Sequence, residues 1–302
     1  MAARLERPEP PLVLITGPTA SGKTALAVRL ARQYAGEIIC ADSRTVYRGM
    51  DIGTAKPTPE EQAVVPHWGL DLVEPGTRFT AADFKQYATA KIAEIRERGH
   101  VPFLVGGTGL YVDAILFDYQ FGDEAQPELR AKLEVLSTEQ LQEYCVKNNI
   151  ELPENRRNKR YLIRAIEQGG VNHKRNRQIL ANTIVVGIAT DTAVLRQRIE
   201  ARGEQLFTNG VVEEAKTLGK KYGWESEAMT GNIYPIIHSY LKEEVTLTEA
   251  KQVFTTRDWQ LAKRQLTWLH RNPHIQWLDL DAAEHYIATR LFGYEQNVLQ
   301  YK

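Results

Sequence analysis

The segment Leu12 to Thr24, LVLITGPTASGKT, decides the fold of this chain of 302 residues. Its short apolar run predicts a buried strand, and the pattern G-x-x-x-x-G-K-T then leads directly into a helical segment, 25–33. Glycines let successive backbone N–H groups turn inward, and the N-terminus of the helix favours negative charge. The pattern therefore predicts a site for a diphosphate or triphosphate, formed by Gly17, Pro18, Thr19, Ala20, Ser21, Gly22, Lys23 and Thr24.

The last two residues of this loop have separate expected roles. Lys23 is expected to reach a β-phosphate, and the hydroxyl of Thr24 is expected to hold Mg²⁺. The alternative is a glycine turn that binds no phosphate. A strand before the loop and a helix directly after it favour the phosphate site.

Composition and charge exclude several classes of protein. The 38 basic residues balance the 38 acidic ones, so a nucleic-acid partner must be bound by a local patch. Cys40 and Cys145 are the only cysteines and form no C-x-x-C pair, which argues for a reducing compartment and against a structural zinc site. The N-terminal residues lack the apolar core of a signal peptide, and no apolar run has membrane length. We expect a cytoplasmic protein with no membrane contact.

Further apolar runs predict more strands of an α/β fold, at 37–41, 71–73, 101–105, 183–189 and 275–280. A capping box at Thr80 and Asp83 predicts a helix that ends at Gly99. A second glycine-rich loop, GGTGLY, follows the run 101–105. Because parallel strands open their carboxyl ends on one edge of a sheet, the two glycine loops suggest a pyrophosphate between them, contacted by Gly107 and Thr108.

Asp42 directly follows the predicted strand 37–41, where a carboxylate points into the crevice of an open α/β sheet. It is a candidate base or metal partner, and the alternative is an aspartate that only caps the following turn. The segment Arg44 to Glu61 after it is basic and punctuated by glycine and proline, which is typical of an active-site rim.

The pattern changes at residue 122 and returns to strand character at 180. Residues 122–179 are polar and helix-forming, which predicts a helical insertion in a core formed by residues 1–121 and 180–302. Within it, Glu154 to Arg177 contains two acidic residues against eight basic ones, Arg156, Arg157, Lys159, Arg160, Arg164, Lys174, Arg175 and Arg177. This segment is either a contact for a polyanion or a solvated charged face.

The helical segment Asp258 to Arg271 interleaves basic and aromatic residues. A stripe of Trp and Leu at helical spacing is more often core, so we assign Trp259 and Trp268 to the core. Lys263 and Arg264 are then left for contact with RNA.

Five sequence blocks occur together in one known family: GPTASGKT, ADSRTVYRGMDIGTAKP, GGTGLYVDAI, NKRYLIRAIE and AKRQLTW. In their order and spacing, the chain resembles the bacterial tRNA dimethylallyltransferases (tRNA isopentenyltransferases) over residues 12–280. The second and third blocks are far more specific than the phosphate loop alone. The resemblance implies a P-loop kinase-like parallel sheet flanked by helices, Mg²⁺ as the cofactor, and no phosphoryl transfer.

The resemblance also implies a reaction, in which a dimethylallyl group moves from its diphosphate to N6 of the adenosine just 3′ of the tRNA anticodon. The leaving diphosphate must be held and neutralised, which loop amides, Lys23 and Mg²⁺ on Thr24 can do. The adenine amino group is a weak nucleophile and needs a base, for which we choose Asp42. Expected partners are dimethylallyl diphosphate and the anticodon stem-loop, bound by a monomer.

The target base must leave its stack, which is inexpensive in a single-stranded loop. Through the resemblance, Thr108 and Tyr111 would line the pyrophosphate side, and the insertion would clasp the anticodon stem. Arg160 and Arg164 fall on the basic motif of the family. The expected tRNA contacts are Asp42, Ser43, Thr45, Tyr47, Arg48, Gly53, Thr54, Arg156, Arg157, Arg160, Arg164, Lys263 and Arg264.

The chain departs from the family pattern at several positions. The insertion is shorter after Glu167, and the exchanges are Thr45 for Gln, Pro235 for a basic residue, Ile236 for an acid, and Asp258-Trp259 for Thr-Arg. These losses are expected to weaken donor affinity, to change the donor, or to mark a branch that anchors phosphate with Arg202 or Lys263 instead.

Three other functions agree with parts of the sequence. A small-molecule kinase would use the same loop and strand-end aspartate, but it leaves GGTGLY unexplained. A prenyltransferase that acts on free adenine nucleotides would keep the chemistry, whereas the basic insertion and C-terminal helix favour tRNA. A non-catalytic RNA-binding protein that retains the loop would explain the lost basic and acidic residues.

Overall fold

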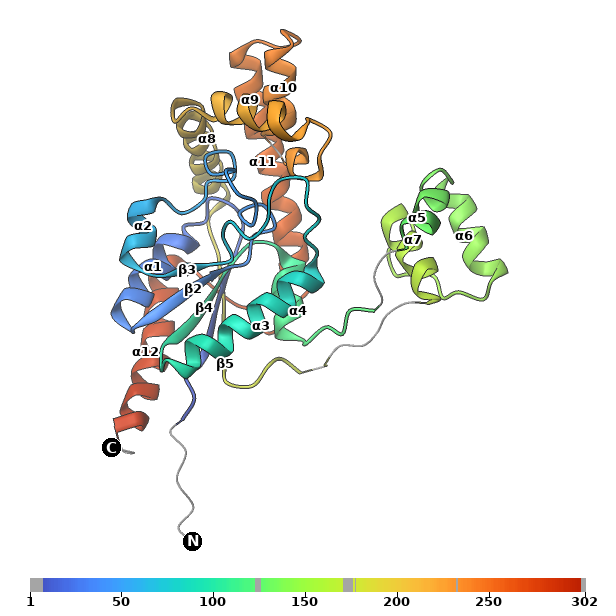
Figure 1. Ribbon diagram of the computed structural model, residues 1–302. Coiled ribbons are helices and arrows are strands. Elements are labelled where there is room, and N and C mark those ends of the chain that lie inside the picture. The colour runs from blue at the N-terminus through green and yellow to red at the C-terminus, as the bar shows by residue number, and fades with distance from the viewer. Residues whose placement is uncertain (1–7, 123–125, 171–175, 177, 232, 300–302) are drawn as a thin grey trace. The chain divides into compact units, whose positions relative to one another are not determined.

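Buried apolar runs make the strands of this chain, and in the described residues they pair into one six-stranded parallel sheet (Figure 1). The strand order is β3-β2-β4-β1-β5-β6. The strands are β1 (Leu12–Thr16), β2 (Gly36–Cys40), β3 (His67–Trp68), β4 (Val101–Gly106), β5 (Thr183–Ile188) and β6 (Gln276–Leu278). Every residue of β1, β2 and β4 is buried, as expected for parallel strands covered on both faces.

The structure is a computed structural model that describes residues 8–122, 126–170, 176, 178–231 and 233–299. Its chain divides into two compact units, Met1–Leu116 with Ile179–Lys302, and Phe117–Gln178. The sequence predicts an insertion of residues 122–179, whereas the second unit begins at Phe117 and ends at Gln178.

Helices cover both faces of the sheet in the first unit. They are α1 (Lys23–Gln33), α2 (Pro59–Val64), α3 (Ala81–Glu97), α4 (Gly109–Leu116), α8 (Thr192–Thr208), α9 (Val211–Tyr222), α10 (Tyr234–Leu241), α11 (Leu247–Leu269) and α12 (Leu280–Leu299), with a 3₁₀ turn, η1 (Glu227–Thr230). Val13 and Ile15 of β1 pack in one buried cluster with Leu26 of α1 and Ile287 of α12. On the other face, α3 lies against β2 and β4, and helices α8 to α11 form a second layer of packing around Phe254.

Neighbouring strands β1 and β4 position the candidate site. Leu14 of β1 lies opposite Leu104 of β4 and Val185 of β5, so both strands that end in glycine loops are adjacent. The chain leaves β1 toward β2 on one side and later returns to β5 on the other, which makes the β1 and β4 ends a topological switch point. Ligands bind in the crevice at such a point in open α/β sheets.

The second unit is a small helical bundle. Its helices are α5 (Pro127–Glu134), α6 (Thr138–Lys147) and α7 (Lys159–Gln168), and its core contains Leu133, Leu141, Cys145, Leu162, Ile163 and Ile166. Glu167 is buried there and accepts hydrogen bonds of 2.8 Å from both Nε and Nη2 of Arg130. This core is small, and the ion pair between Arg130 and Glu167 provides a further contact between α5 and α7.

Most expected elements of the α/β fold are confirmed, including the capping box at Thr80 and Asp83 that opens α3. The short strand expected at 71–73 is wrong. The edge strand instead is β3, and Val73 makes only an isolated bridge to Tyr47. Asp71 has a left-handed backbone with a φ of 53°, which turns the chain out of an extended path. No described helix combines the length and the low polarity that a membrane crossing requires.

Candidate functional site

The loop after β1 turns sharply and delivers the chain into α1. Gly22 has a φ of 90°, which favours glycine, and it precedes the first helical residue, Lys23. The backbone N–H of Ser21 donates to the carbonyl of Pro18 at 3.3 Å, and the Lys23 ammonium donates to the same carbonyl at 3.0 Å. Lys23 is thereby folded back over the loop that it ends.

Charged groups gather around this lysine. Burial lowers the pKa of Lys23 to about 8, the carboxylates of Asp42 and Asp258 raise it, and the guanidinium of Arg202 lowers it. These four groups therefore lie within electrostatic range of one another. An anion bound beside Lys23 would offset the cost of burying its ammonium, because the opposite charge favours the charged form.

Two helices brace the phosphate loop with side chains. From α8, Arg198 donates to the carbonyl of Ser21 at 3.1 Å, and Arg202 donates to the hydroxyl of Thr19 at 3.0 Å. From α11, the side-chain oxygen of Gln265 accepts from the backbone N–H of Thr19 at 2.8 Å. The loop amide of Thr19 is thus already bonded within the protein.

Neither Arg198 nor Gln265 is among the residues predicted from the sequence. The spacing of Arg198 and Arg202 by four residues puts both on one face of a helix, which is a usable signal. Gln265 lies in the block AKRQLTW, which carries part of the family resemblance.

The second glycine loop touches the first. A Cβ atom on Gly107 would come within 2.4 Å of Nε2 of Gln265 and 3.0 Å of the carbonyl oxygen of Gly17. A side chain at this position would press on the Gly17 carbonyl and would displace the amide of Gln265, whose oxygen is bonded to Thr19. The expected meeting of the two glycine loops at one edge of the sheet is therefore present in the structure.

Asp42 both closes a turn and faces this edge. Its Oδ1 accepts the backbone N–H of Arg44 at 2.8 Å, and its backbone carbonyl accepts the Thr45 hydroxyl at 3.4 Å. Thr108, in the second glycine loop, accepts the backbone N–H of Ser43 at 3.1 Å. The alternatives of a capping aspartate and a site aspartate therefore do not exclude each other, because only one carboxylate oxygen serves the turn.

The chain from Arg44 to Lys56, here called the rim segment, is held by charged side chains. Glu214 of α9 accepts the backbone N–H groups of Asp51, Ile52 and Gly53 at 2.9, 2.7 and 2.8 Å. The hydroxyl of Tyr234 adds a fourth hydrogen bond to this carboxylate at 2.9 Å.

A buried lysine also holds the rim segment. The Lys56 side chain is 3% exposed and its ammonium contacts Asp51 at 2.5 Å and Asp71 at 2.7 Å. It also donates to the carbonyl of Tyr47 at 3.0 Å. Tyr47 and Thr45 are buried, and the Thr54 hydroxyl donates to the carbonyl of Met50, so these expected tRNA contacts are packed or bonded within the segment.

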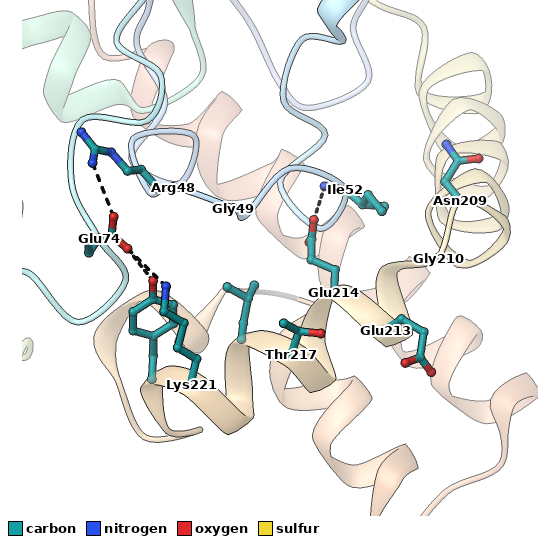
Figure 2. Close-up of a pocket in the computed structure, with 12 residues that line it drawn as sticks. Arg48, Gly49, Ile52, Glu74, Asn209, Gly210, Glu213, Glu214, Thr217 and Lys221 are labelled. Atoms are coloured by element: carbon teal, nitrogen blue, oxygen red, sulfur yellow. Dashed lines mark hydrogen bonds and ion pairs between the residues drawn. The ribbon is translucent and has the colours of Figure 1, made fainter.

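Arg48 lies apart from Asp42 and lines a pocket of about 720 Å³ between the rim segment and α9 (Figure 2). Figure 2 shows Glu74 between Arg48 and Lys221, with contacts of 3.5 and 3.9 Å to their nitrogens. The pocket walls carry three carboxylates, those of Glu74, Glu213 and Glu214, against two cations. This charge balance disfavours a polyanion in the pocket itself.

The expected basic contacts have different surroundings in the two units. On α11, Lys263 and Arg264 are exposed, and the Lys263 ammonium lies 5.9 Å from the ring centre of Trp259. In the second unit, Arg156, Arg157 and Arg160 are exposed, whereas Arg164 contacts Glu167 at 3.3 Å. The remaining expected cations Lys174, Arg175 and Arg177 fall outside the described residues.

The departures from the family pattern have structural roles. Pro235 lies in the first turn of α10, and Ile236 is buried in the cluster around Phe254. Asp258, with its side chain 2% exposed, contacts Arg202 at 2.7 Å. Trp259 is half-buried with Arg196 4.7 Å from its ring centre, and it packs against the same cluster as Ala20 of the phosphate loop.

Two family models match the chain. One is described as IPP transferase and matches residues 45–272, and the other as Isopentenyl transferase and matches residues 10–71. A tRNA dimethylallyltransferase of Roseiflexus sp. (strain RS-1) is 40% identical over 290 residues, which cover 91% of this chain and 94% of the relative. One of Bacillus licheniformis is 36% identical over 291 residues, with 91% and 93% covered.

Solved structures give the same result. The tRNA isopentenylpyrophosphate transferase of Bacillus halodurans has a TM-score of 0.72 and 36% identity, covering 97% of this chain and 99% of its own. A eukaryotic dimethylallyltransferase acting on tRNA shares the fold with a TM-score of 0.74 at 21% identity, covering 89% and 73%. The resemblance seen in the sequence is confirmed: the chain belongs to the IPP transferase family.

Proposed function

We propose that this chain transfers a dimethylallyl group from dimethylallyl diphosphate to N6 of the adenosine 3′ of a tRNA anticodon. The observation that carries the proposal is the meeting of a phosphate loop with a carboxylate. Asp42 lies close enough for its charge to act on Lys23, the last lysine of that loop. Relatives named tRNA dimethylallyltransferase, aligned over about nine-tenths of the chain, support it.

The phosphate loop serves the donor. As the C1–O bond of the donor breaks, its electron pair goes to the diphosphate, and negative charge grows on the leaving oxygens. The ammonium of Lys23 and the N-terminus of α1 stabilise that charge where it develops. Arg202 is held beside the loop by its contact with Asp258, which balances its charge, and it donates to the hydroxyl of Thr19 in the loop.

Asp42 serves the acceptor. Its Oδ1 is bonded to the Arg44 amide, so the other oxygen is the one available to take a proton. As the bond from N6 to C1 forms, one N6 proton passes to this oxygen, which keeps the new secondary amine neutral. The products are the N6-dimethylallyl adenosine and diphosphate.

A magnesium ion fits this donor set. Among the described residues, no three His, Cys, Asp or Glu side chains could hold a metal ion together. Mg²⁺ does not need such a cluster, because it binds through one or two protein oxygens together with substrate phosphates and water. Thr24, in the first turn of α1, would hold the ion, which when bound neutralises charge on the diphosphate.

A single incubation tests the proposal. The protein is mixed with Mg²⁺, dimethylallyl diphosphate and an anticodon stem-loop, and the RNA is weighed by mass spectrometry. We expect the mass of one C5H8 unit on the adenosine 3′ of the anticodon. The same mass gain on free AMP, and none on RNA, would show that the acceptor is a free nucleotide. ATP turnover with no prenyl transfer would favour a kinase.

The Asp42→Asn variant separates the two roles of this residue. An asparagine oxygen can still accept the Arg44 amide, so the turn stays closed while the base is lost. We expect turnover to fall by about 10²- to 10⁴-fold, with RNA affinity almost unchanged. Glu213→Gln, an exposed carboxylate of α9, is the control, and wild-type turnover in Asp42→Asn would end the assignment of the base.

A further inference from the structure

The side chain of Arg44 is a cation that neutral groups hold in place. Its Nη1 donates to the carbonyls of Glu227 and Ala228 at 3.0 and 3.4 Å, and its Nη2 to the hydroxyl of Thr230 at 3.4 Å. Within the described residues it contacts no carboxylate, although it is only half-exposed. In the part of the chain that the structure describes, its charge therefore has no partner of opposite sign.

Nearby cations of the same unit differ from Arg44 in this respect. Arg202 contacts Asp258, Lys56 contacts Asp51 and Asp71, and Arg48 contacts Glu74. Each of those charges is balanced by a carboxylate and contributes to the internal structure. A partly desolvated guanidinium without such a balance attracts an anion from outside the protein.

The position of Arg44 links it to the site. Its backbone N–H donates to Oδ1 of Asp42, and its side chain reaches η1, which precedes Tyr234. Burial raises the pKa of the Tyr234, Tyr111 and Tyr47 phenols, and the Arg44 guanidinium opposes this rise in all three. The charges that act on Lys23 are instead those of Asp42, Arg202 and Asp258.

The charge of Arg44 thus acts on the three tyrosines, whereas Lys23 interacts with Arg202 and Asp258. Asp42 is a neighbour of both Arg44 and Lys23. Pro235, which follows Tyr234, brings no charge to this part of the site, whereas Arg44 does. Phosphate is the anion that both proposed substrates carry, and a guanidinium fork can bind two of its oxygens at once.

We propose that Arg44 is a phosphate-binding residue of the site, next to Asp42. This inference rests on the proposed function for the identity of the substrates. The phosphate can belong to the acceptor RNA or to the donor diphosphate. In either case, the three contacts to η1 hold the guanidinium in place before the substrate binds.

Two variants distinguish the charge of Arg44 from its hydrogen bonds to η1. Arg44→Gln keeps an amide that can donate to the carbonyls of η1 but loses the charge, and Arg44→Lys keeps the charge but loses the fork. Arg29→Gln is the matched control, since Arg29 is exposed and contacts Glu284 of α12. Binding of inorganic diphosphate and of the RNA stem-loop is measured separately, without turnover, at several salt concentrations.

In Arg44→Gln we expect one of two losses. If the phosphate belongs to RNA, the slope of log K against log salt falls by about 0.7 to 0.9, and Arg44→Lys retains most of the slope. If it belongs to the donor, the affinity for diphosphate falls by about tenfold, with an unchanged RNA slope. Arg29→Gln should show neither change.

Wild-type affinities and an unchanged slope in Arg44→Gln would overturn the proposal. A lower melting temperature with unchanged binding would also overturn it, because Arg44 would then be a structural tether only. Binding is measured without turnover, so its outcome is distinct from a failure of the proposed function. A wild-type protein that binds both probes but adds no prenyl group would disprove the proposed function and leave the role of Arg44 standing.

Discussion

The phosphate loop and the rim segment lie at the same edge of the sheet, yet they are held in different ways. The phosphate loop, Gly17 to Thr24, is short and lies between a strand and a helix, and Arg198, Arg202 and Gln265 brace it with side chains from α8 and α11. The rim segment has a different kind of support, because Glu214 accepts three of its backbone amides and the buried Lys56 contacts two carboxylates. Basic and amide side chains of two helices hold one side of the site, whereas a carboxylate of α9 and a lysine of the segment itself hold the other.

The difference separates the effects of mutation on the two substrates. A change in the phosphate loop should affect the donor, and a change in the supports of the rim segment should affect the acceptor. A variant that weakens use of the donor and of the acceptor equally would mean that the phosphate loop and the rim segment depend on each other.

Lys23→Met should have the strongest effect on the donor side. Removing a charge that stabilises the leaving diphosphate should lower kcat/KM for the donor by about 10²- to 10³-fold. RNA affinity should change less than about twofold, because Lys23 is bonded to Pro18 of its own loop and not to the rim segment. Steady-state kinetics with varied donor, together with RNA titration, provide the measurement.

Lys216→Met, an exposed lysine of α9, is the control for that experiment. Equal losses of donor turnover and RNA affinity in Lys23→Met would show that the loop is structural.

Glu214→Gln should reduce use of the acceptor. The amide nitrogen of glutamine cannot accept, so at least one of the amides of Asp51, Ile52 and Gly53 loses its partner. These residues are exposed or partly buried, so the loss of one hydrogen bond costs about 0.5–1.5 kcal/mol, which corresponds to a loss of about 2- to 13-fold in kcat/KM for RNA if the rim must be ordered to bind it. Donor affinity should not change.

Glu213→Gln tests the neighbouring carboxylate, which is 77% exposed and should give wild-type values. A fall in donor affinity in Glu214→Gln would contradict the separation of the two sides.

The pH dependence of donor binding should report Lys23. Because burial lowers its pKa to about 8, the lysine of the free protein is charged below pH 8 and becomes neutral above it. The donor needs the charged form, so its Kd should rise by about tenfold per pH unit above 8. Calorimetric titrations of inorganic diphosphate measure this, and a slope retained in Lys23→Met would assign the titration to another group.

The second unit gives the smallest expected effect. Replacing Arg156, Arg157 and Arg160 by Gln should lower the salt slope of RNA binding by about two units if all three contact phosphates. Arg164→Gln should change the slope much less, because Arg164 contacts the buried Glu167. An unchanged slope in the triple variant would identify the segment as a solvated face.

The same contrast explains what the sequence could predict. The phosphate loop, the second glycine loop and Asp42 follow apolar strands directly, so local patterns place all three at one edge of the sheet. Glu214 is an ordinary charged residue of a helix, and nothing within a few positions of it indicates its partners. Arg198 shares a helix face with Arg202, but that spacing does not identify the loop carbonyl to which Arg198 donates. The strand expected at 71–73 failed because Asp71 turns the chain to reach Lys56, a contact that no local pattern reveals.

The helix α11 carries two of the contacts that fix the site, from Asp258 to Arg202 and from Gln265 to Thr19. Asp258 and Gln265 are seven positions apart, which is about two helical turns, so both lie on one face. One residue inserted between them would rotate Gln265 by about 100° and take it away from the loop. The length of α11 between these two residues is therefore as important to the site as the side chains themselves.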